Sequence, residues 1–323
     1  MVEGDEVKAP ARAGDGAEPR LGSVLGAGLV AASLFAAPRF VPALLPLAVV
    51  APFPLVLQRL SAGGGSVALA TLLAAALVGA VVAPAPAASF LVVLAAPALL
   101  IGESLARGRG LLRGCGWAFG LLVAETAVAL TFASGVLAAR VLDPLDQLVS
   151  EGFLAELRAA GVPPERVSEW TSQIGTLRAA LAVVFPAAYV IGAAVLVMAN
   201  AALLRLYLSR RDPGWLEDGE FERVRWPLGL VVVFLLAGAA VALPTARPVA
   251  YNVLLVTAFF FALQGLAVVA FYARRLAGPP LLRTVVVVLV LANPWAPQIL
   301  GLLGLFDNWF DFRRFAELPP RGE

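Results

Sequence analysis

Glu125 is the residue whose chemistry fits its sequence surroundings least well. It lies in the apolar run LLVAETAVALTF, and no basic residue lies one helical turn away. An ionised carboxylate at the middle of a membrane span costs several kcal/mol. We therefore expect Glu125 to face the interior of a helical bundle. Two interpretations stay open: a ligand-binding or proton-linked carboxylate, or a protonated carboxyl group that is hydrogen-bonded to a neighbouring helix.

Side-chain amides form the second group of candidates. Asn200, Asn252 and Gln264 lie inside or at the ends of apolar runs, and Gly265 follows Gln264 directly. Amides in such runs usually bond across helices, with about 0.6 to 2 kcal/mol each. A glycine beside Gln264 lets another backbone or a ligand come close. These four residues and Glu125 are the predicted ligand contacts, and structural bonding between helices is the alternative.

The C-terminal end of the last apolar run carries a third group. Asp307, Asp311, Phe312 and Arg313 belong to the sequence FDNWFDFRR. Aromatic rings next to arginine are typical of the membrane interface. The pattern predicts a salt-bridged interfacial helix, with a docking surface for a cytoplasmic partner as the other interpretation.

Several chemistries lack the residues that they need. The chain has no His, one Cys (Cys115) and one Lys (Lys8), and it has no GxxxxGK[ST] phosphate-binding loop. We therefore predict no enzyme, no catalytic residue, no metal site and no cofactor. The arginines sit in short loops between apolar runs, so no nucleic-acid partner is predicted either.

The composition defines the elements that must position these residues. Of the 323 residues, 60% are hydrophobic and 14% are charged, and the mean hydropathy is +0.88. Soluble domains have about 45–50% apolar and 25% charged residues. The sequence therefore predicts an all-α, polytopic transmembrane helical bundle in the lipid bilayer, with about eight spans plus a C-terminal re-entrant or ninth span.

The chain divides into three parts. Residues 1–20 form a polar N-terminal tail that is expected to be disordered, 21–306 the transmembrane domain, and 307–323 an interfacial C-terminal tail. The predicted spans are 21–37, 41–57, 66–83, 87–102, 114–138, 179–204, 227–243, 250–272 and 284–306. Four prolines between Pro42 and Pro54 exclude a regular helix for the second span. Such broken helices favour a protein that contains a cavity.

The placement of arginine predicts an orientation. Basic loops follow the fourth, sixth and eighth spans, which places them inside if the N-terminus is cytoplasmic. We expect a multi-pass protein of the bacterial cytoplasmic (inner) membrane. Asn293-Pro294-Trp295-Ala296-Pro297 interrupts the last apolar run, and a re-entrant hairpin there would return the C-terminus to the cytoplasm.

Residues 140–177 are too polar for a span and predict an extramembrane amphipathic cap. Asp143-Pro144 is expected to begin one helix and Gly161 to close it. Pro163-Pro164-Glu165 opens a second helix, which continues into the sixth span. The cap is interpreted as structural, with a gate over a ligand site as the alternative. Glu103 and Arg107 have the spacing of an ion pair on one helix.

Four short stretches resemble the YybS-like family of bacterial membrane proteins, a family of unknown function with about eight spans. They are Gln264–Val269 with Asn252, Gly304–Asp307 followed by Phe310–Arg313, Phe221 with Arg225-Trp226-Pro227, and Phe185-Pro186 with Asn200. At a greater remove, the small residues of the first span, Ala27, Ala31, Ala32 and Ala36, are similar to those of the S components of energy-coupling-factor transporters.

The resemblance to S components implies a transport-type subunit that binds a small molecule and works with a separate ATPase. This is the predicted function. The alternative is a non-transporting membrane scaffold or assembly factor that recruits a cytoplasmic partner.

Overall fold

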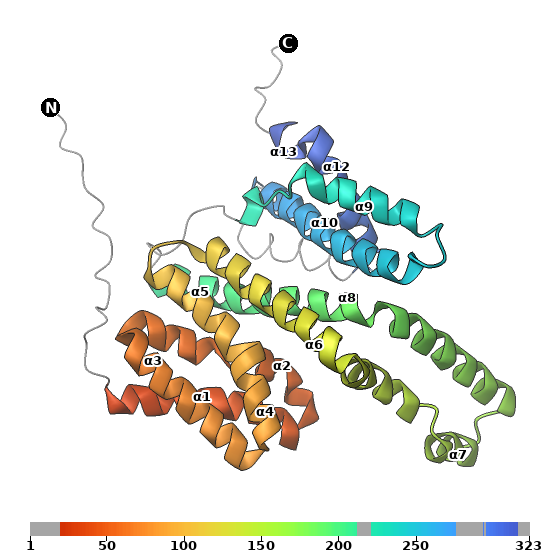
Figure 1. The fold of residues 1–323 in the computed structure, drawn as a ribbon, viewed down its shortest axis with the longest axis horizontal. Helices are drawn as coiled ribbons and strands as arrows, with labels where there is room; N and C mark the ends of the chain where they lie inside the picture. The colour runs from red at the N-terminus through yellow and green to blue at the C-terminus, as the bar shows by residue number, and fades with distance from the viewer. Residues whose placement is uncertain (1–19, 212–220, 276–292, 294, 316–323) are drawn as a thin grey trace, which may run out of the picture. The chain divides into compact units, whose positions relative to one another are not determined.

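A computed structural model describes residues 20–211, 221–275, 293 and 295–315 (Figure 1). These residues are almost entirely helical, and no strand occurs among them. Six helical segments of this part of the chain are long and apolar enough to cross a membrane: Leu21–Phe40, Pro42–Val81, Pro84–Ala106, Leu111–Ala159, Pro164–Arg211 and Arg247–Arg275. This confirms the predicted polytopic helical bundle. Residues 284–292 of the predicted last span lie outside the described residues.

The helices form two compact units, which are described separately. The described residues of the first unit are 20–125 and 192–211, and those of the second are 126–191, 221–275, 293 and 295–315. The helices are α1 (Leu21–Phe40), α2 (Leu45–Val49), α3 (Phe53–Val81), α4 (Pro84–Ser89), α5 (Ala96–Ala106), α6 (Leu111–Gln147), α7 (Glu151–Ala159), α8 (Pro164–Arg211), α9 (Leu228–Ala240), α10 (Arg247–Arg275), α12 (Ala296–Phe310) and α13 (Phe312–Phe315).

The first unit contains the broken helices that its sequence predicts. The proline-rich segment forms a short 3-10 turn and the five-residue helix α2 before α3 begins at Phe53. Inside α3, Gly63 has φ 83° and ψ 179°, so α3 is two helical pieces. Glycine adopts this conformation because it has no Cβ atom. A π-helical segment, Phe90–Ala95, joins α4 to α5.

Small residues bring α1 close to α3 in the first unit. Ala31, Ala32 and Ala36 are buried, and a Cβ atom at Gly28 would lie 3.0 Å from the carbonyl oxygen of Ala70. The predicted small-residue face of the first span is therefore a contact between helices. A second apolar core joins α5 to the beginning of α6 and the end of α8, with Ile101, Leu105, Ala118, Leu122, Ala193 and Val197 among its buried members.

An ion-pair cluster lies beside this second core. Arg107 Nε lies 2.5 Å from a Glu103 carboxylate oxygen, which confirms the predicted pair. Arg59 of α3 adds a contact that sequence analysis missed, because 44 residues separate it from Glu103. Its Nε lies 2.6 Å from the other carboxylate oxygen, and its side chain is only 9% exposed. The Arg59–Glu103 pair therefore ties α3 to α5.

In the second unit, the C-terminal end of α6 and the N-terminal end of α8 form a hairpin, and α7 lies in the connection between them (Figure 1). Gly161 has φ 82° just after α7, and α8 begins at Pro164 and continues into the sixth predicted span, as expected, to end at Arg211. The prediction that Asp143-Pro144 begins a helix is wrong, because α6 runs through both residues to Gln147. Ser150 caps α7 instead, since its side chain accepts a hydrogen bond from the Phe153 amide at 3.4 Å.

Candidate functional site

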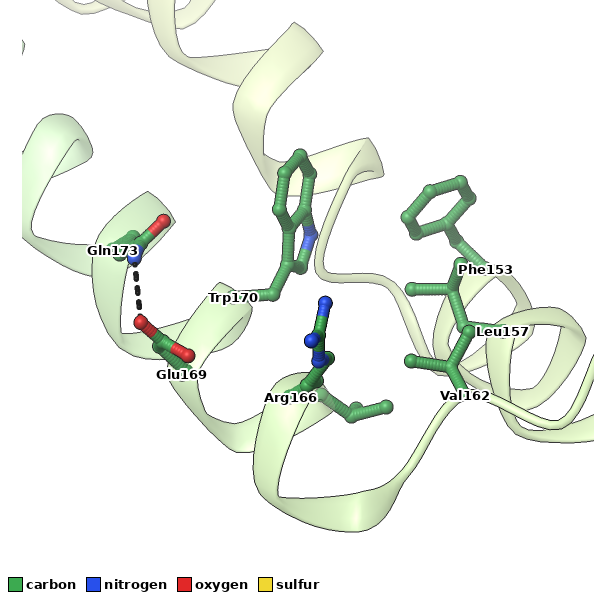
Figure 2. Close-up of a pocket in the computed structure, with 8 residues that line it drawn as sticks. Phe153, Leu157, Val162, Arg166, Glu169, Trp170 and Gln173 are labelled. Atoms are coloured by element: carbon green, nitrogen blue, oxygen red, sulfur yellow. Dashed lines mark hydrogen bonds between the residues drawn. The ribbon is translucent and has the colours of Figure 1, made fainter.

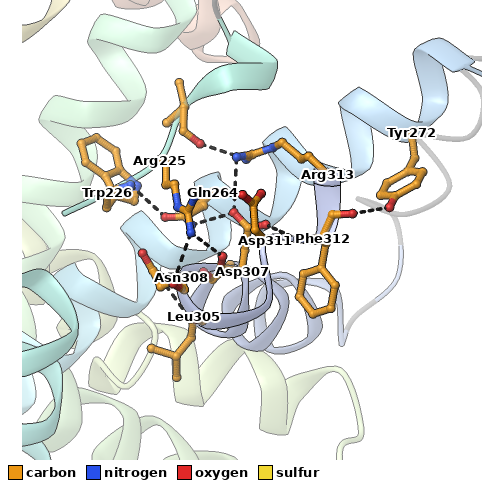
Figure 3. Close-up of polar contacts among 12 residues, drawn as sticks. Arg225, Trp226, Gln264, Tyr272, Leu305, Asp307, Asn308, Asp311, Phe312 and Arg313 are labelled. Carbon is orange, nitrogen blue, oxygen red and sulfur yellow. Dashed lines mark hydrogen bonds and ion pairs between the residues drawn. The ribbon is translucent and has the colours of Figure 1, made fainter. Parts of the chain in front are cut away.

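Four predicted polar residues of the second unit, Gln264, Asp307, Asp311 and Arg313, lie in one cluster (Figure 3). The Gln264 side chain is fully buried in α10. Its carbonyl oxygen accepts the Trp226 backbone amide at 3.0 Å, and its nitrogen donates to the Asp307 carboxylate at 2.9 Å. Gln264 therefore connects the segment before α9, α10 and α12.

Asp307 is the most deeply placed acid of this cluster, with no exposed side-chain surface. One carboxylate oxygen contacts Gln264 and lies 3.3 Å from Arg313 Nη1, and the other accepts the Phe312 amide at 3.1 Å. The Arg313 side chain is 11% exposed and also donates to the Val224 carbonyl at 2.9 Å. A buried carboxylate needs such partners, because water is not available to solvate it.

Arg225 binds the C-terminal end of α12. It donates to the carbonyl oxygens of Asp307 and Asn308, each at 3.2 Å, and lies 3.3 Å from the Asp311 carboxylate. Asp311 itself ends α12 in the left-handed conformation, with φ 45°. Unpaired carbonyls at a helix C-terminus favour a cation. The end of α12 is therefore salt-bridged, as the sequence predicted, and the sequence did not indicate Arg225 as one of the partners.

Two glycines let α10 and α12 touch backbone to backbone. A Cβ atom at Gly265 would overlap the carbonyl oxygen of Leu300, and one at Gly304 would overlap that of Phe261. The close approach expected beside Gln264 is thus occupied by another helix.

The two helices also run in the same direction. Gly301 lies near Ala258, Asp307 near Gln264, and the Tyr272 hydroxyl donates to the Phe312 carbonyl at 2.5 Å. The C-terminal ends of α10 and α12 therefore lie at the same end of the second unit.

Asn252 repairs an interruption of α8. Pro186 lies inside α8 and cannot donate a backbone hydrogen bond. The Asn252 oxygen accepts the Ala187 amide at 2.7 Å, and its nitrogen donates to the Val183 carbonyl at 2.8 Å. In an uninterrupted helix these two backbone groups would bond to each other. The Asn252 amide thus takes the place of one helical hydrogen bond.

We expect Asn252→Leu to destabilise the second unit by about 1–3 kcal/mol, because two backbone groups lose their partner, one of them on the buried Ala187. Thermal denaturation in detergent measures the effect. In a Pro186→Ala background the Ala187 amide can return to Val183, so the same substitution should have a smaller effect. Equal effects in both backgrounds would contradict this role.

Asn200 and Glu125 belong to the first unit. Asn200 donates to the carbonyl oxygens of Val49 at 2.9 Å and Leu196 at 3.0 Å, so it holds the end of α2. Its own oxygen is buried and has no hydrogen-bond partner in the described part of the chain. The same holds for Oε2 of Glu125. Glu125 lies three residues after Leu122 on the α6 face that carries the second apolar core.

The described helices and their buried polar contacts are those of a multi-pass helical membrane protein. Residues 29–308 match the family described as "Predicted membrane protein (DUF2232)". The match covers most of the chain, and the protein therefore belongs to this family of membrane proteins of unknown function. Comparisons with the curated proteins and with the solved structures gave no significant match.

Proposed function

We propose that this protein is a transport-type subunit that binds a small molecule through Glu125. The observation that carries the proposal is the buried Glu125 Oε2, which has no hydrogen-bond partner among the described residues. A buried carboxyl oxygen without a partner is unfavourable unless it is protonated or bound to a ligand. It complements a ligand that donates a hydrogen bond or carries an amine.

The other predicted ligand contacts differ from Glu125 in their bonding. Both polar atoms of the Gln264 side chain and both of Asn252 have partners within the protein. Gly265 packs against Leu300. Among the predicted contacts, Glu125 Oε2 and the Asn200 oxygen are the buried polar atoms that have no hydrogen-bond partner in the described part of the chain.

The backbone of the first unit supports a binding role. The Gly63 break in α3 and the π-helical segment Phe90–Ala95 both interrupt apolar helices. Irregular backbone at membrane depth is tolerated where it is buried in protein or lines a cavity, and π-helical turns are frequent at functional sites.

We further propose that the protein is related to the YybS-like family and is similar to S components, and that a separate ATPase supplies energy. It would lie in a bacterial inner membrane with its N-terminus in the cytoplasm. The ATPase is implied by the similarity to S components, and the sequence itself contains no phosphate-binding loop.

Native mass spectrometry of the full chain in mild detergent tests the proposal. We expect a discrete extra mass of a few hundred daltons on the wild type and its loss from Glu125→Gln. Glu156→Gln, which changes an exposed acid on α7, is the control and should keep the extra mass. A bare wild-type protein, or an extra mass that survives Glu125→Gln, would count against Glu125 as a ligand contact.

A second candidate function is recruitment of a partner protein. Trp309 and Phe310 are 52% and 57% exposed at the end of α12, next to the exposed Arg314. Trp309, Phe310 and Arg314 would form the docking surface, because Asp307 and Arg313 bond inside the protein. Loss of one defined partner on Trp309→Ala, with Glu125→Gln silent, would favour this function over ligand binding.

A further inference from the structure

A cavity that is widely open at the surface, with a volume of about 330 Å³, lies between α7 and the beginning of α8, within the second unit (Figure 2). Apolar side chains form most of its wall: Phe153, Leu157, Val162, Val167 and the indole of Trp170. Three polar side chains of α8 complete it, namely Arg166, Glu169 and Gln173. This volume suits a small organic molecule.

The cavity lies beyond the apolar part of α8. The apolar part of α8 begins at about Ala179, whereas the cavity residues of this helix end at Gln173 and centre on Arg166 to Trp170. With a rise of 1.5 Å per residue, Trp170 lies about 13 Å beyond the apolar run. The headgroup layer extends only about 5–8 Å beyond the hydrocarbon on each side. A helix tilt of up to 40° would reduce the distance to about 10 Å.

Contacts with the end of α6 hold the α8 side of the cavity in place. Trp170 Nε1 donates to the Leu148 carbonyl at 3.1 Å. Nearer the membrane, Arg178 forms two hydrogen bonds to the Asp146 carboxylate, at 2.5 and 3.3 Å. These contacts connect the beginning of α8 to the end of α6 beside the cavity.

The charged groups of the cavity are not paired with each other. Arg166 and Glu169 lie three residues apart on one face of α8, a spacing at which opposite charges can meet. No ion pair joins them, and the Arg166 guanidinium has no side-chain partner among the described residues. Glu169 accepts one hydrogen bond from Gln173 at 3.2 Å (Figure 2). One cation and one anion thus remain available beside an apolar wall.

We propose that this cavity binds a small zwitterion with an apolar body, that is, an amino acid with an aromatic or branched aliphatic side chain. The carboxylate of the ligand would contact Arg166, its ammonium group Glu169, and its side chain the surface of Phe153, Leu157 and Trp170. The pairing follows from charge complementarity, because each ligand charge meets the opposite charge of the wall. The proposal does not depend on Glu125.

The test measures binding of radiolabelled L-phenylalanine to the full chain in detergent by equilibrium dialysis. We expect saturable binding that Arg166→Gln and Glu169→Gln each weaken by about tenfold or more, because each removes one charge-assisted contact. Arg158→Gln, which changes an exposed arginine of α7 outside the cavity, and Glu125→Gln should leave binding unchanged.

Two analogues of phenylalanine test which charge of the ligand contacts Arg166 and which contacts Glu169. Phenylalaninamide lacks the carboxylate, and N-acetylphenylalanine lacks the ammonium group, so both should bind the wild type more weakly than phenylalanine. Arg166→Gln should no longer distinguish phenylalanine from its amide, and Glu169→Gln should no longer distinguish it from the acetylated form. The proposal is overturned if no saturable binding occurs, or if both variants bind phenylalanine like the wild type.

A lipid headgroup that carries an ammonium and a phosphate has the same pair of charges as the proposed amino acid ligand. Binding of phenylalanine is therefore compared in nanodiscs of phosphatidylethanolamine and of phosphatidylglycerol. Equal binding in both supports a soluble ligand. Loss of binding in phosphatidylethanolamine alone would identify the cavity as a lipid site and overturn the proposal.

Discussion

Asp307→Ala is expected to destabilise the second unit by about 3–5 kcal/mol, the usual effect of removing one partner from a buried ion pair. The Asp307 side chain has no exposed surface, and it holds Gln264, the Phe312 amide and Arg313. Without it, the Arg313 guanidinium, which is 11% exposed, stays buried with no opposite charge beside it. Thermal denaturation of the purified protein in detergent measures the loss.

Asp311→Ala is the matched control for this prediction. Asp311 is also an aspartate that pairs with an arginine in the same cluster, but the side chains of its pair are 41% and 40% exposed. Exposed pairs contribute about 0–1 kcal/mol. If the two alanine variants denature at the same temperature, the buried carboxylate does not hold the cluster together.

Gly304→Ala is expected to have the second-largest effect. The added methyl group would overlap the Phe261 carbonyl oxygen, so α12 could not keep its place against α10. Overpacking of this kind typically costs about 1–3 kcal/mol and can exceed that when only backbone atoms could move. We expect lower thermal stability and faster proteolysis of the chain after Arg275.

Gly301→Ala tests whether the effect comes from the contact or from the glycine itself. Gly301 lies three residues earlier on the same helix, and its Cβ atom would meet the Ala258 carbonyl oxygen at 3.7 Å, an ordinary contact. This variant should be as stable as the wild type or slightly more stable, since alanine favours helix. Equal destabilisation at both positions would refute the packing explanation.

The sequence predicts the fold class well because lipid imposes strong constraints on it. Long apolar runs without charge allow few structures besides membrane helices. Local sequence patterns also predicted helix boundaries correctly where a single residue determines the backbone conformation, as at Gly161 after α7 and Pro164 at the start of α8. The prediction that a helix begins at Asp143-Pro144 was wrong, because a sequence with proline in the last turn of a helix resembles one with proline in the first turn. Tertiary context, which a local pattern does not contain, decided that case.

The partners within the polar cluster could not be read from the sequence. Gln264 and Asp307 were singled out because they are polar residues beside apolar runs, yet 43 positions separate them. Arg225 contacts residues 82 to 86 positions away, and its own segment gives no local sign of this. Such pairings depend on the packing of whole helices. The roles of Asn200, Asn252, Gln264 and Gly265 as ligand contacts, and of Asp311 and Phe312 as a docking surface, stay predictions.

Under the proposed function, a ligand binds Glu125 inside the membrane at a carboxyl oxygen that has no hydrogen-bond partner among the described residues. Dicyclohexylcarbodiimide, which enters the bilayer and reacts with protonated carboxyl groups, tests it most directly. Peptide mass mapping should find Glu125 modified in protein stripped of bound small molecules and protected in protein that carries its ligand. An unmodified Glu125 in stripped protein, or equal modification in both samples, would contradict the account.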